Sequence, residues 1–335
     1  MKLKDAYIYK MGHYHPETVL DNSFFDLLEI GSEASWIEER TGIRSRRTVM
    51  KPRDILALKN KSKTMTQICD EGGVESIADI GQRAWQNMIG SGDPSLNPDL
   101  LICGSSVPDF AIPANASTIA ARLGLKSTAF DANSACSSFV TNIHLARGLI
   151  ASGMHRSIAV FNPERYSLKV DFNDRNSCVL FGDGSTCAYL GDEEEPGSLR
   201  IVDSLIASDP EGHDLVKIPI DGLFSQRGAA VQKFAITKTI EVSRAIMDRN
   251  ALNPDEISYF TGHQANLRMI KSAVEKLGID SRKHLYNVDD FGNQGAAGAP
   301  AVLSMNWERF QKGDRILVAV VGSGLTWGAA LLEKV

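Results

Sequence analysis

The nine residues Asp131-Ala-Asn-Ser-Ala-Cys136-Ser-Ser-Phe139 place a single cysteine in a turn made mostly of small residues. The preceding residues, 128–132, are typical of a buried strand. After the turn, apolar side chains recur at the spacing of one helix face, at Phe139, Val140, Ile143, Ala146, Leu149 and Ile150. The sequence therefore predicts that Cys136 lies where a strand turns into a helix.

A cysteine at the start of a helix has a chemical consequence. The unpaired backbone amides and the positive end of the helix dipole favour a thiolate over a thiol there. We therefore expect a thiolate at Cys136, which is the nucleophile that covalent acyl transfer requires. The alternative is a buried cysteine that packs as a small hydrophobic side chain.

The composition excludes several classes of protein. The chain has 335 residues, enough for two domains or one duplicated domain. Its net charge of −5 argues against nucleic-acid binding. Five cysteines without a C-x-x-C pair indicate neither a disulfide framework nor a zinc ribbon. Because no signal peptide or membrane span is evident, we expect a cytoplasmic protein without membrane, nucleic acid, metal or resident cofactor.

An internal repeat indicates how the chain is organised. Residues 96–104 (LNPDLLICG) correspond to residues 252–262 (LNPDEISYFTG), and Leu123-Gly124 corresponds to Leu277-Gly278. The matching points lie about 155 residues apart, which predicts two similar α/β halves in one chain. Alternating strands and helices predict sheets covered by helices. The acidic segment 191–197 is the predicted boundary between the halves.

Each half is expected to supply part of one site. The N-terminal half, residues 1–190, holds Cys136, and the C-terminal half, residues 191–335, holds His263 after a strand and Asn293 in a glycine-rich turn. Equivalent loops of a duplicated fold meet at its pseudo-twofold axis, so the turns of Cys136 and Asn293 should face each other with His263 nearby. The alternative for His263 is an ordinary packed histidine.

A basic stretch precedes these elements. Residues 36–47 combine Trp36 with several arginines, which is compatible with a solvated loop around a packed tryptophan. The other interpretation is a site for a phosphate-bearing ligand, in which the indole stacks and the arginines supply charge. Residues 48–65 are predicted to form a basic loop.

Longer motifs match a known family in its order along nearly the whole chain. They are Trp36-Ile37…Arg40-Thr-Gly-Ile-Arg44, Ala135-Cys136, Asp174-Arg175…Leu180-Phe-Gly-Asp-Gly184, Gly262-His263-Gln-Ala-Asn-Leu-Arg268, Gly292-Asn293 and Gly322-Ser-Gly-Leu-Thr-Trp-Gly328. With these motifs the chain resembles β-ketoacyl-acyl-carrier-protein synthase III, a condensing enzyme of the thiolase superfamily. The resemblance implies an α/β, five-layered αβαβα thiolase-like fold made of two duplicated halves, a homodimer, and a catalytic triad of Cys136, His263 and Asn293.

The resemblance also implies a decarboxylative Claisen condensation. An acyl-CoA primer is loaded on Cys136, and malonyl-acyl-carrier-protein then loses carbon dioxide and attacks it to give a β-ketoacyl thioester. His263 and Asn293 can donate hydrogen bonds to the thioester oxygen that gains charge during decarboxylation. The backbone amides of Cys136 and Ser323 would form the oxyanion hole for the acyl carbonyl.

Further residues are assigned to the substrates by the same resemblance. Trp36 and Arg175 would flank the adenine of coenzyme A, and Arg40 would lie near its pantetheine or phosphate path. Asn266 would line the site below the histidine. A basic patch that docks an acidic acyl carrier protein would contain Lys233 and Arg268, although Glu275 replaces a usual lysine of that patch.

Other departures concern the acyl pocket. Ile112 stands where the family usually has a phenylalanine that enters the partner subunit's pocket, which suggests a deeper pocket and a primer longer than acetyl. By the same resemblance Ile112, Gln226 and Gly228 are assigned to substrate binding. Gln226 and Gln232 stand at positions that are usually apolar in the family and suggest a more polar tunnel. Ser323 replaces the middle one of three glycines. Together these changes suggest a specialised relative, with secondary metabolism as one setting, rather than the housekeeping initiator of fatty-acid synthesis.

Two alternatives remain open from the sequence. One is an acyltransferase that moves the acyl group from Cys136 to an oxygen or nitrogen acceptor without decarboxylation. The other is a non-catalytic subunit of a heterodimer, against which the presence of Cys136, His263 and Asn293 together argues.

Overall fold

The computed structural model describes residues 4–90 and 96–335. The strands are β1 (Tyr7–Tyr14), β2 (Thr18–Asp21), β3 (Ser45–Thr48), β4 (Leu100–Cys103), β5 (Thr128–Asp131), β6 (Ser157–Glu164), β7 (Gly184–Gly191), β8 (Leu199–Ser208), β9 (Val216–Lys217), β10 (Ser225–Gln226), β11 (Tyr259–Gly262), β12 (Arg315–Gly322) and β13 (Thr326–Lys334).

The α-helices are α1 (Asn22–Asp26), α2 (Ala34–Thr41), α3 (Pro52–Lys59), α4 (Met65–Asp70), α5 (Ile77–Ile89), α6 (Asn115–Leu123), α7 (Ser138–Ala151), α8 (Gly228–Arg249), α9 (Leu267–Leu277), α10 (Val288–Phe291) and α11 (Gly298–Met305). Short 3-10 helices occur at Tyr166–Leu168, Pro210–Gly212, Pro254–Glu256, Ser281–Lys283, Gly295–Ala297 and Trp307–Arg309. Among the residues described, none of the helices is both long and apolar enough to cross a membrane.

The main sheet consists of two half-sheets with the same plan. Its strand order in the described residues is β11-β12-β13-β8-β1-β7-β6-β4-β5. β1 and β8 meet only where Tyr7 pairs with Arg200 and Ile8 with Leu199, so this junction is narrow. In the first half-sheet β4 is parallel to β6, and β7 and β1 follow antiparallel. The second repeats this with β11, β12, β13 and β8, which confirms the duplication.

Over residues 4–90 and 96–335 the chain passes from one half-sheet to the other once. Residues 192–198 connect β7, the last strand of the first half-sheet in chain order, to β8, the first strand of the second. The segment 191–197, proposed as the boundary from its composition, lies at this connection. The division into residues 1–190 and 191–335 therefore falls at the end of β7.

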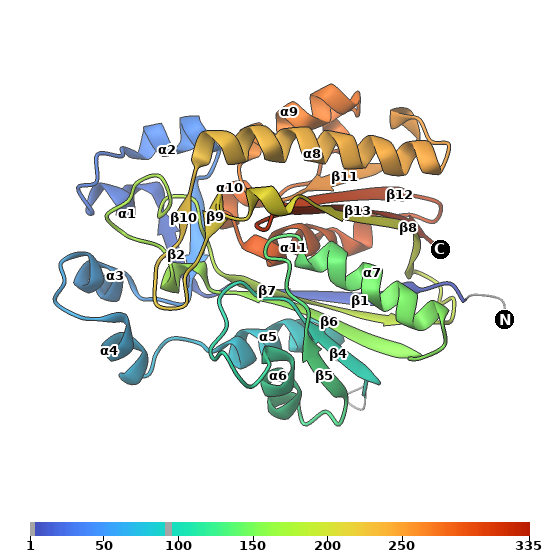
Figure 1. Cartoon of the computed structure of the whole chain (residues 1–335), viewed down its shortest axis with the longest axis horizontal. Helices are drawn as coiled ribbons and strands as arrows, with labels where there is room; N and C mark the ends of the chain where they lie inside the picture. The colour runs from blue at the N-terminus through green and yellow to red at the C-terminus, as the bar shows by residue number, and fades with distance from the viewer. Residues whose placement is uncertain (1–3, 91–95) are drawn as a thin grey trace.

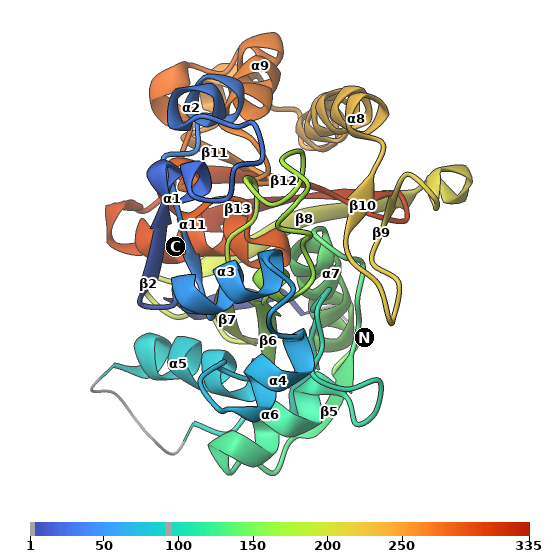
Figure 2. The same cartoon turned by 90° about the vertical axis from the view of Figure 1, so that its left-hand side faces the viewer.

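The elements stack in five layers, as Figure 1 shows. Helices α8 and α9 cover the half-sheet of β8, β11, β12 and β13, and α5 and α6 cover the outer face of the other half-sheet. Helices α7 and α11 lie between the two half-sheets. Figure 2, turned by 90°, shows the same order of layers. The predicted five-layered αβαβα fold is therefore confirmed.

The apolar core explains this layering. The central cluster joins Phe139 and Ile143 of α7 and Val302 of α11 to strand residues such as Ile158 and Val318 from the two half-sheets. Each of these side chains is almost fully buried, which contributes about 1.5–3 kcal/mol per large side chain. Two outer clusters fill the spaces beneath α5 and α6 and beneath α8 and α9. Helix α7 is thereby fixed on both sides, and the cysteine turn at its start with it.

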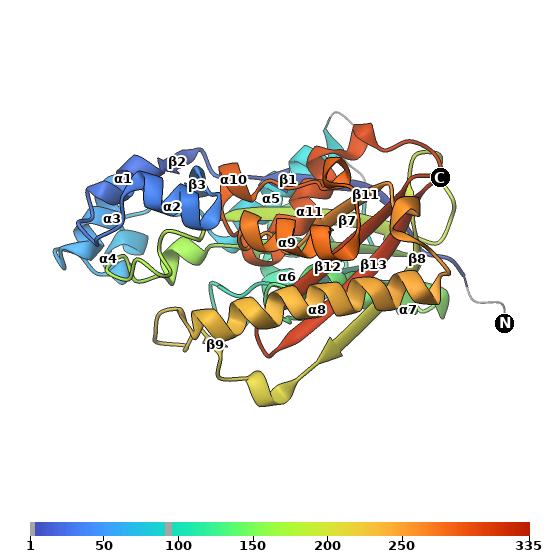
Figure 3. The same cartoon turned by 90° about the horizontal axis from the view of Figure 1, so that it is seen from above.

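Helices α1 to α4 gather at the end of the molecule opposite the C-terminus (Figure 1 and Figure 3). The prediction of a loop over residues 48–65 is wrong, because α3 lies within this segment. Pro52 at its first turn already has a helical φ, and Asp54 carries negative charge near the helix N-terminus. Ile55 is fully buried and anchors the helix through tertiary packing that a short basic segment does not reveal.

Candidate active site

Cys136 lies in a tight turn between β5 and α7. Ala135 has a φ of 52°, in the left-handed region that residues other than glycine rarely adopt. The side-chain oxygen of Asn133 accepts hydrogen bonds from the Ala135 amide (2.8 Å) and from Ser138 Oγ (3.2 Å). These bonds hold the strained turn, so that Cys136 precedes the first helical residue, Ser138, by two positions.

The ionisation of Cys136 differs from the expectation drawn from its position. Burial raises the pKa of Cys136 to about 12, and the hydrogen bond with Tyr166 lowers this pKa by a smaller amount. Cys136 Sγ lies 3.5 Å from Tyr166 Oη. The prediction of a resting thiolate is therefore wrong, because loss of hydration is the largest effect on this pKa and favours the neutral thiol. The thiol must lose its proton as it attacks.

His263 immediately follows β11, and its amide donates to the Ala319 carbonyl (2.9 Å). The buried Gln264 side chain holds this turn, since it donates to the Gly262 carbonyl (2.7 Å) and accepts from the Asn287 amide (3.0 Å). Burial lowers the pKa of His263 to about 4, so the imidazole is neutral at neutral pH. His263 Nδ1 is buried without a partner among the described residues, which leaves Nε2 as the ring nitrogen available to a ligand.

Asn293 lies between α10 and α11. Its amide donates to the Leu180 carbonyl (2.8 Å), and its carbonyl accepts from the Gly182 amide (3.0 Å). Its side-chain Oδ1 accepts from the Gly295 amide (3.0 Å). Because the side-chain oxygen is engaged in this way, the Nδ2 group is the part of Asn293 that can donate to a ligand.

A cavity of about 880 Å³ brings these side chains together, because Cys136, His263 and Asn293 all line it. Ile112 and Lys233 do not line it and are exposed. The remaining residues predicted to bind substrate, carrier protein or an oxyanion do line it: Trp36, Arg40, Arg175, Gln226, Gly228, Asn266, Arg268 and Ser323.

The outer part of the cavity is aromatic and basic. The guanidinium carbon of Arg175 lies 5.0 Å from the centre of the Trp36 ring, and that of Arg40 lies 5.8 Å from it. Arg175 therefore covers the indole in this structure, and an adenine would have to displace it to enter between the two. Asn266 also has a structural role, because its side chain caps α9 and donates to the Arg40 carbonyl (3.2 Å).

The sequence analysis assigned no role to three residues near the site, namely Tyr166, Glu164 and Gln264. Tyr166 contacts Cys136 Sγ, and Glu164 is a fully buried carboxyl group nearby. Gln264 belongs to a recognised motif, but only the structure shows that it joins the turn of His263 to the start of α10. No group of three or more His, Cys, Asp or Glu residues in the described chain is arranged to hold a metal ion.

Gly322, at the end of β12, sets how closely the C-terminal half approaches the cysteine turn. A Cβ atom at Gly322 would lie 2.6 Å from the Ser134 carbonyl oxygen and 2.8 Å from the Ser137 amide. We expect Gly322→Ala to lower the free energy of unfolding by about 1–3 kcal/mol. We also expect it to slow acylation of Cys136, because the turn must shift; denaturant unfolding and intact-protein mass spectrometry measure the two effects.

The control for this substitution is Gly148→Ala in α7, where an added Cβ has open space. It should leave acylation unchanged. Wild-type stability and acylation in Gly322→Ala would contradict the close approach of the two halves.

The duplicated five-layered fold, with a cysteine, a histidine and an asparagine lining one cavity, defines the chain as a thiolase-like protein. The family model for 3-oxoacyl-[acyl-carrier-protein] synthase III matches residues 130–210, and the model for its C-terminal part matches residues 247–334. The chain belongs to this family and is an enzyme of the β-ketoacyl-acyl-carrier-protein synthase III type, as predicted.

Individual relatives match over almost the full length. The β-ketoacyl-acyl-carrier-protein synthase III of Aliarcobacter butzleri is 32% identical, with 96% of each chain covered. The crystal structure of 3-oxoacyl-(acyl carrier protein) synthase III from Pseudomonas aeruginosa is similar with a TM-score of 0.85 and 27% identity, covering 98% of each chain. A priming β-ketosynthase from a polyketide biosynthetic pathway is similar with a TM-score of 0.82 and 25% identity, covering 100% of this chain and 98% of that one.

Proposed function

We propose that the protein catalyses the decarboxylative Claisen condensation of an acyl-CoA primer with malonyl-acyl-carrier-protein, with Cys136 as nucleophile. The observation that carries this proposal is that Cys136, His263 and Asn293 line one cavity. The same cavity extends to Trp36 and Arg175, whose aromatic and basic groups suit the adenine and phosphates of coenzyme A.

In the first step Cys136 Sγ attacks the thioester carbonyl of the acyl-CoA, forms a new thioester and releases the coenzyme A thiol. The backbone amides of Cys136 and Ser323 are proposed to stabilise the oxyanion. The Ser323 side chain donates to the Val216 carbonyl (2.6 Å), and this bond holds the segment from which the second amide would act.

In the second step the malonyl group loses carbon dioxide, and charge develops on its thioester oxygen. His263 Nε2 and Asn293 Nδ2 are proposed to donate to this oxygen. The carbanion then attacks the acyl group on Cys136 to give the β-ketoacyl thioester. A neutral imidazole suits the donor role, and the lowered pKa of His263 keeps it neutral.

The proposal includes a primer longer than acetyl and a role of the enzyme in specialised metabolism. Ile112 in place of a phenylalanine and Gln226 on the cavity wall support it. The likeness to a priming polyketide β-ketosynthase offers further support. For the second substrate, the exposed Lys233 and the cavity-rim residue Arg268 offer positive charge to an acidic carrier protein, which steers association.

We further propose that two copies of the chain associate through the edge strand β5. Its outer edge leaves backbone groups unpaired, and such edges are commonly covered in stable proteins. Large apolar side chains are exposed on this strand and on the nearby loop, namely Phe130, Phe110 and Ile112. Ile112 is 86% exposed and is proposed to reach the acyl pocket of the second copy.

The test is the release of carbon dioxide from malonyl-acyl-carrier-protein by the enzyme supplied with an acyl-CoA. We expect stoichiometric carbon dioxide and a β-ketoacyl product. An acyl-enzyme that forms but transfers its acyl group to an oxygen or nitrogen acceptor, without carbon dioxide, would instead identify a simple acyltransferase. The variant Cys69→Ala, which alters an exposed cysteine outside the cavity, is the matched control and should behave as wild type.

A further inference from the structure

A chain of hydrogen bonds leads from Cys136 into the protein interior. Cys136 Sγ lies 3.5 Å from Tyr166 Oη, and Tyr166 Oη donates to Ser106 Oγ (2.9 Å). Ser106 Oγ in turn donates to Glu164 Oε1 (3.1 Å). Each hydroxyl in this chain can accept one proton and donate another, so the chain has a consistent direction from the thiol to the carboxyl group.

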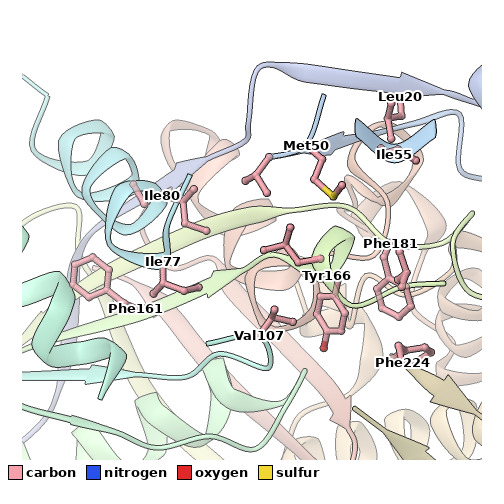
Figure 4. Close-up of a cluster of buried hydrophobic side chains, with 14 of the residues drawn as sticks. Leu20, Met50, Ile55, Ile77, Ile80, Val107, Phe161, Tyr166, Phe181 and Phe224 are labelled. Carbon is pink, nitrogen blue, oxygen red and sulfur yellow. The ribbon is translucent and has the colours of Figure 1, made fainter. Parts of the chain in front are cut away.

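Tyr166 and Glu164 are buried, whereas Ser106, between them, is partly buried and lines the cavity. Tyr166 is 2% exposed, and its ring stacks on Phe181 at a centroid distance of 4.5 Å, with Phe224 against its edge (Figure 4). Glu164 is fully buried, and its two oxygens also accept from the amides of Ser106 (2.9 Å) and Ala296 (3.2 Å). A buried carboxyl group placed in this way, two hydroxyl groups from a thiol, is otherwise unexplained by the proposed chemistry.

We propose that Tyr166, Ser106 and Glu164 form a proton relay that takes the thiol proton of Cys136 during acyl loading and returns it at the end of the reaction. This inference rests on the proposed function, because it assumes that Cys136 is acylated. Tyr166 acts on the reacting sulfur directly, whereas Ser106 and Glu164 act through it.

The proton balance of the reaction closes with this relay. During loading the bond from Cys136 Sγ to the acyl carbon forms, and the bond from that carbon to the sulfur of coenzyme A breaks. The Cys136 thiol gives its proton to the Tyr166 hydroxyl, Tyr166 gives its own proton to Ser106, and Ser106 gives its own proton to Glu164. The thiolate of the departing coenzyme A takes a proton from solvent. After condensation the acyl carbon leaves Cys136 as its bond to the carbanion forms, and Glu164 returns the proton along the same path.

The charges around Glu164 are compatible with both transfers. Burial, together with a smaller effect of the Asp183 carboxylate, raises the pKa of Glu164 to about 8, and this value includes the lowering effect of the hydrogen bonds from Ser106 and Ala296. The next residue in sequence, Arg165, forms an ion pair with Asp109 and does not pair with Glu164. The carboxyl group can therefore gain and lose a proton near neutral pH, whereas His263, with a pKa of about 4, is a weaker proton acceptor.

The test is the single-turnover rate of Cys136 acylation by an acyl-CoA, followed by intact mass as a function of pH. We expect Tyr166→Phe and Glu164→Gln each to slow acylation at pH 7 by about a hundredfold. Because both residues serve one path, the double variant should be no slower than either single variant. Wild-type acylation should rise with pH through about 8, as Glu164 ionises, and this rise should be lost in Glu164→Gln.

The matched control is the other tyrosine–glutamate pair, since Tyr14 Oη donates to Glu75 (2.9 Å) outside the cavity. Tyr14→Phe with Glu75→Gln should acylate as wild type. Should Tyr166→Phe not fold, Ser106→Ala interrupts the same path with a smaller change. Wild-type rates in Tyr166→Phe (or Ser106→Ala) and in Glu164→Gln would overturn the relay. Two further results together would also overturn it: rate losses that multiply when Tyr166→Phe and Glu164→Gln are combined, and a rise of acylation with pH that persists in Glu164→Gln. Absence of acylation in the wild-type enzyme would instead contradict the proposed function.

Discussion

Cys136→Ala is expected to abolish acylation of the protein by acyl-CoA while leaving the fold intact. In the wild-type enzyme the mass should increase by that of one acyl group, and a panel of acyl-CoAs would reveal the preferred primer. The substitution removes the only cysteine among the described residues that line the cavity, and it makes the side chain smaller in a site that already contains space. Intact-protein mass spectrometry measures the loss of labelling, and thermal unfolding verifies the fold.

The other cysteines serve as controls for this result. Cys103, Cys178 and Cys187 are buried in the core, whereas Cys69 is exposed and is therefore the thiol most open to adventitious acylation. Cys69→Ala should retain full labelling. An acyl group that persists on the Cys136→Ala variant would show that the nucleophile has been assigned wrongly.

His263→Ala and Asn293→Ala are expected to lower the rate of malonyl decarboxylation by about 10²–10³-fold each, corresponding to about 3 kcal/mol per donor. The reason is that each removes one hydrogen-bond donor from the proposed position of the enolate oxygen. The Gly295 amide donates to Asn293 Oδ1 and thereby fixes the side chain. The Nδ2 group is therefore preorganised, and the free-energy cost of orienting it during the reaction is small. Release of labelled carbon dioxide from malonyl-acyl-carrier-protein measures the effect.

Loading and decarboxylation should separate in these variants. His263→Ala and Asn293→Ala should still take up the acyl group from acyl-CoA, because Cys136 and its hydrogen bond to Tyr166 are unchanged. Cys136→Ala should still decarboxylate the malonyl group, because the two donors remain. Unimpaired decarboxylation in both His263→Ala and Asn293→Ala would refute their role as the donors.

These predictions depend partly on features that can be recognised in the sequence alone, namely an internal repeat and local turn patterns. The repeat between residues 96–104 and 252–262 predicts the duplicated fold, because both copies begin with Leu-Asn-Pro-Asp, continue into a strand and end at a glycine. The small-residue turns around Cys136 and Asn293 are also local patterns. A duplicated fold then brings them to one axis, and the shared cavity agrees with this expectation.

The position of α3 could not be obtained in the same way. Its eight residues have a weak apolar pattern, and the helix is anchored by the buried side chain of Ile55, which packs against distant parts of the chain. The stacking of Arg175 on Trp36 is similar, since two segments far apart in sequence meet only in the folded protein. The motifs name both residues, but they do not show that one covers the other.

The sequence by itself determined the class of fold, the family and the three residue types of the candidate site, because these follow from local spacing, a repeat and long motifs. Only the tertiary structure decided the ionisation of that site. The pKa of Cys136 depends on how completely the fold removes water from its sulfur, and its contact with Tyr166 joins residues 30 positions apart. Burial and contacts of this kind arise from the packing of all five layers, so no local pattern of residues encodes them.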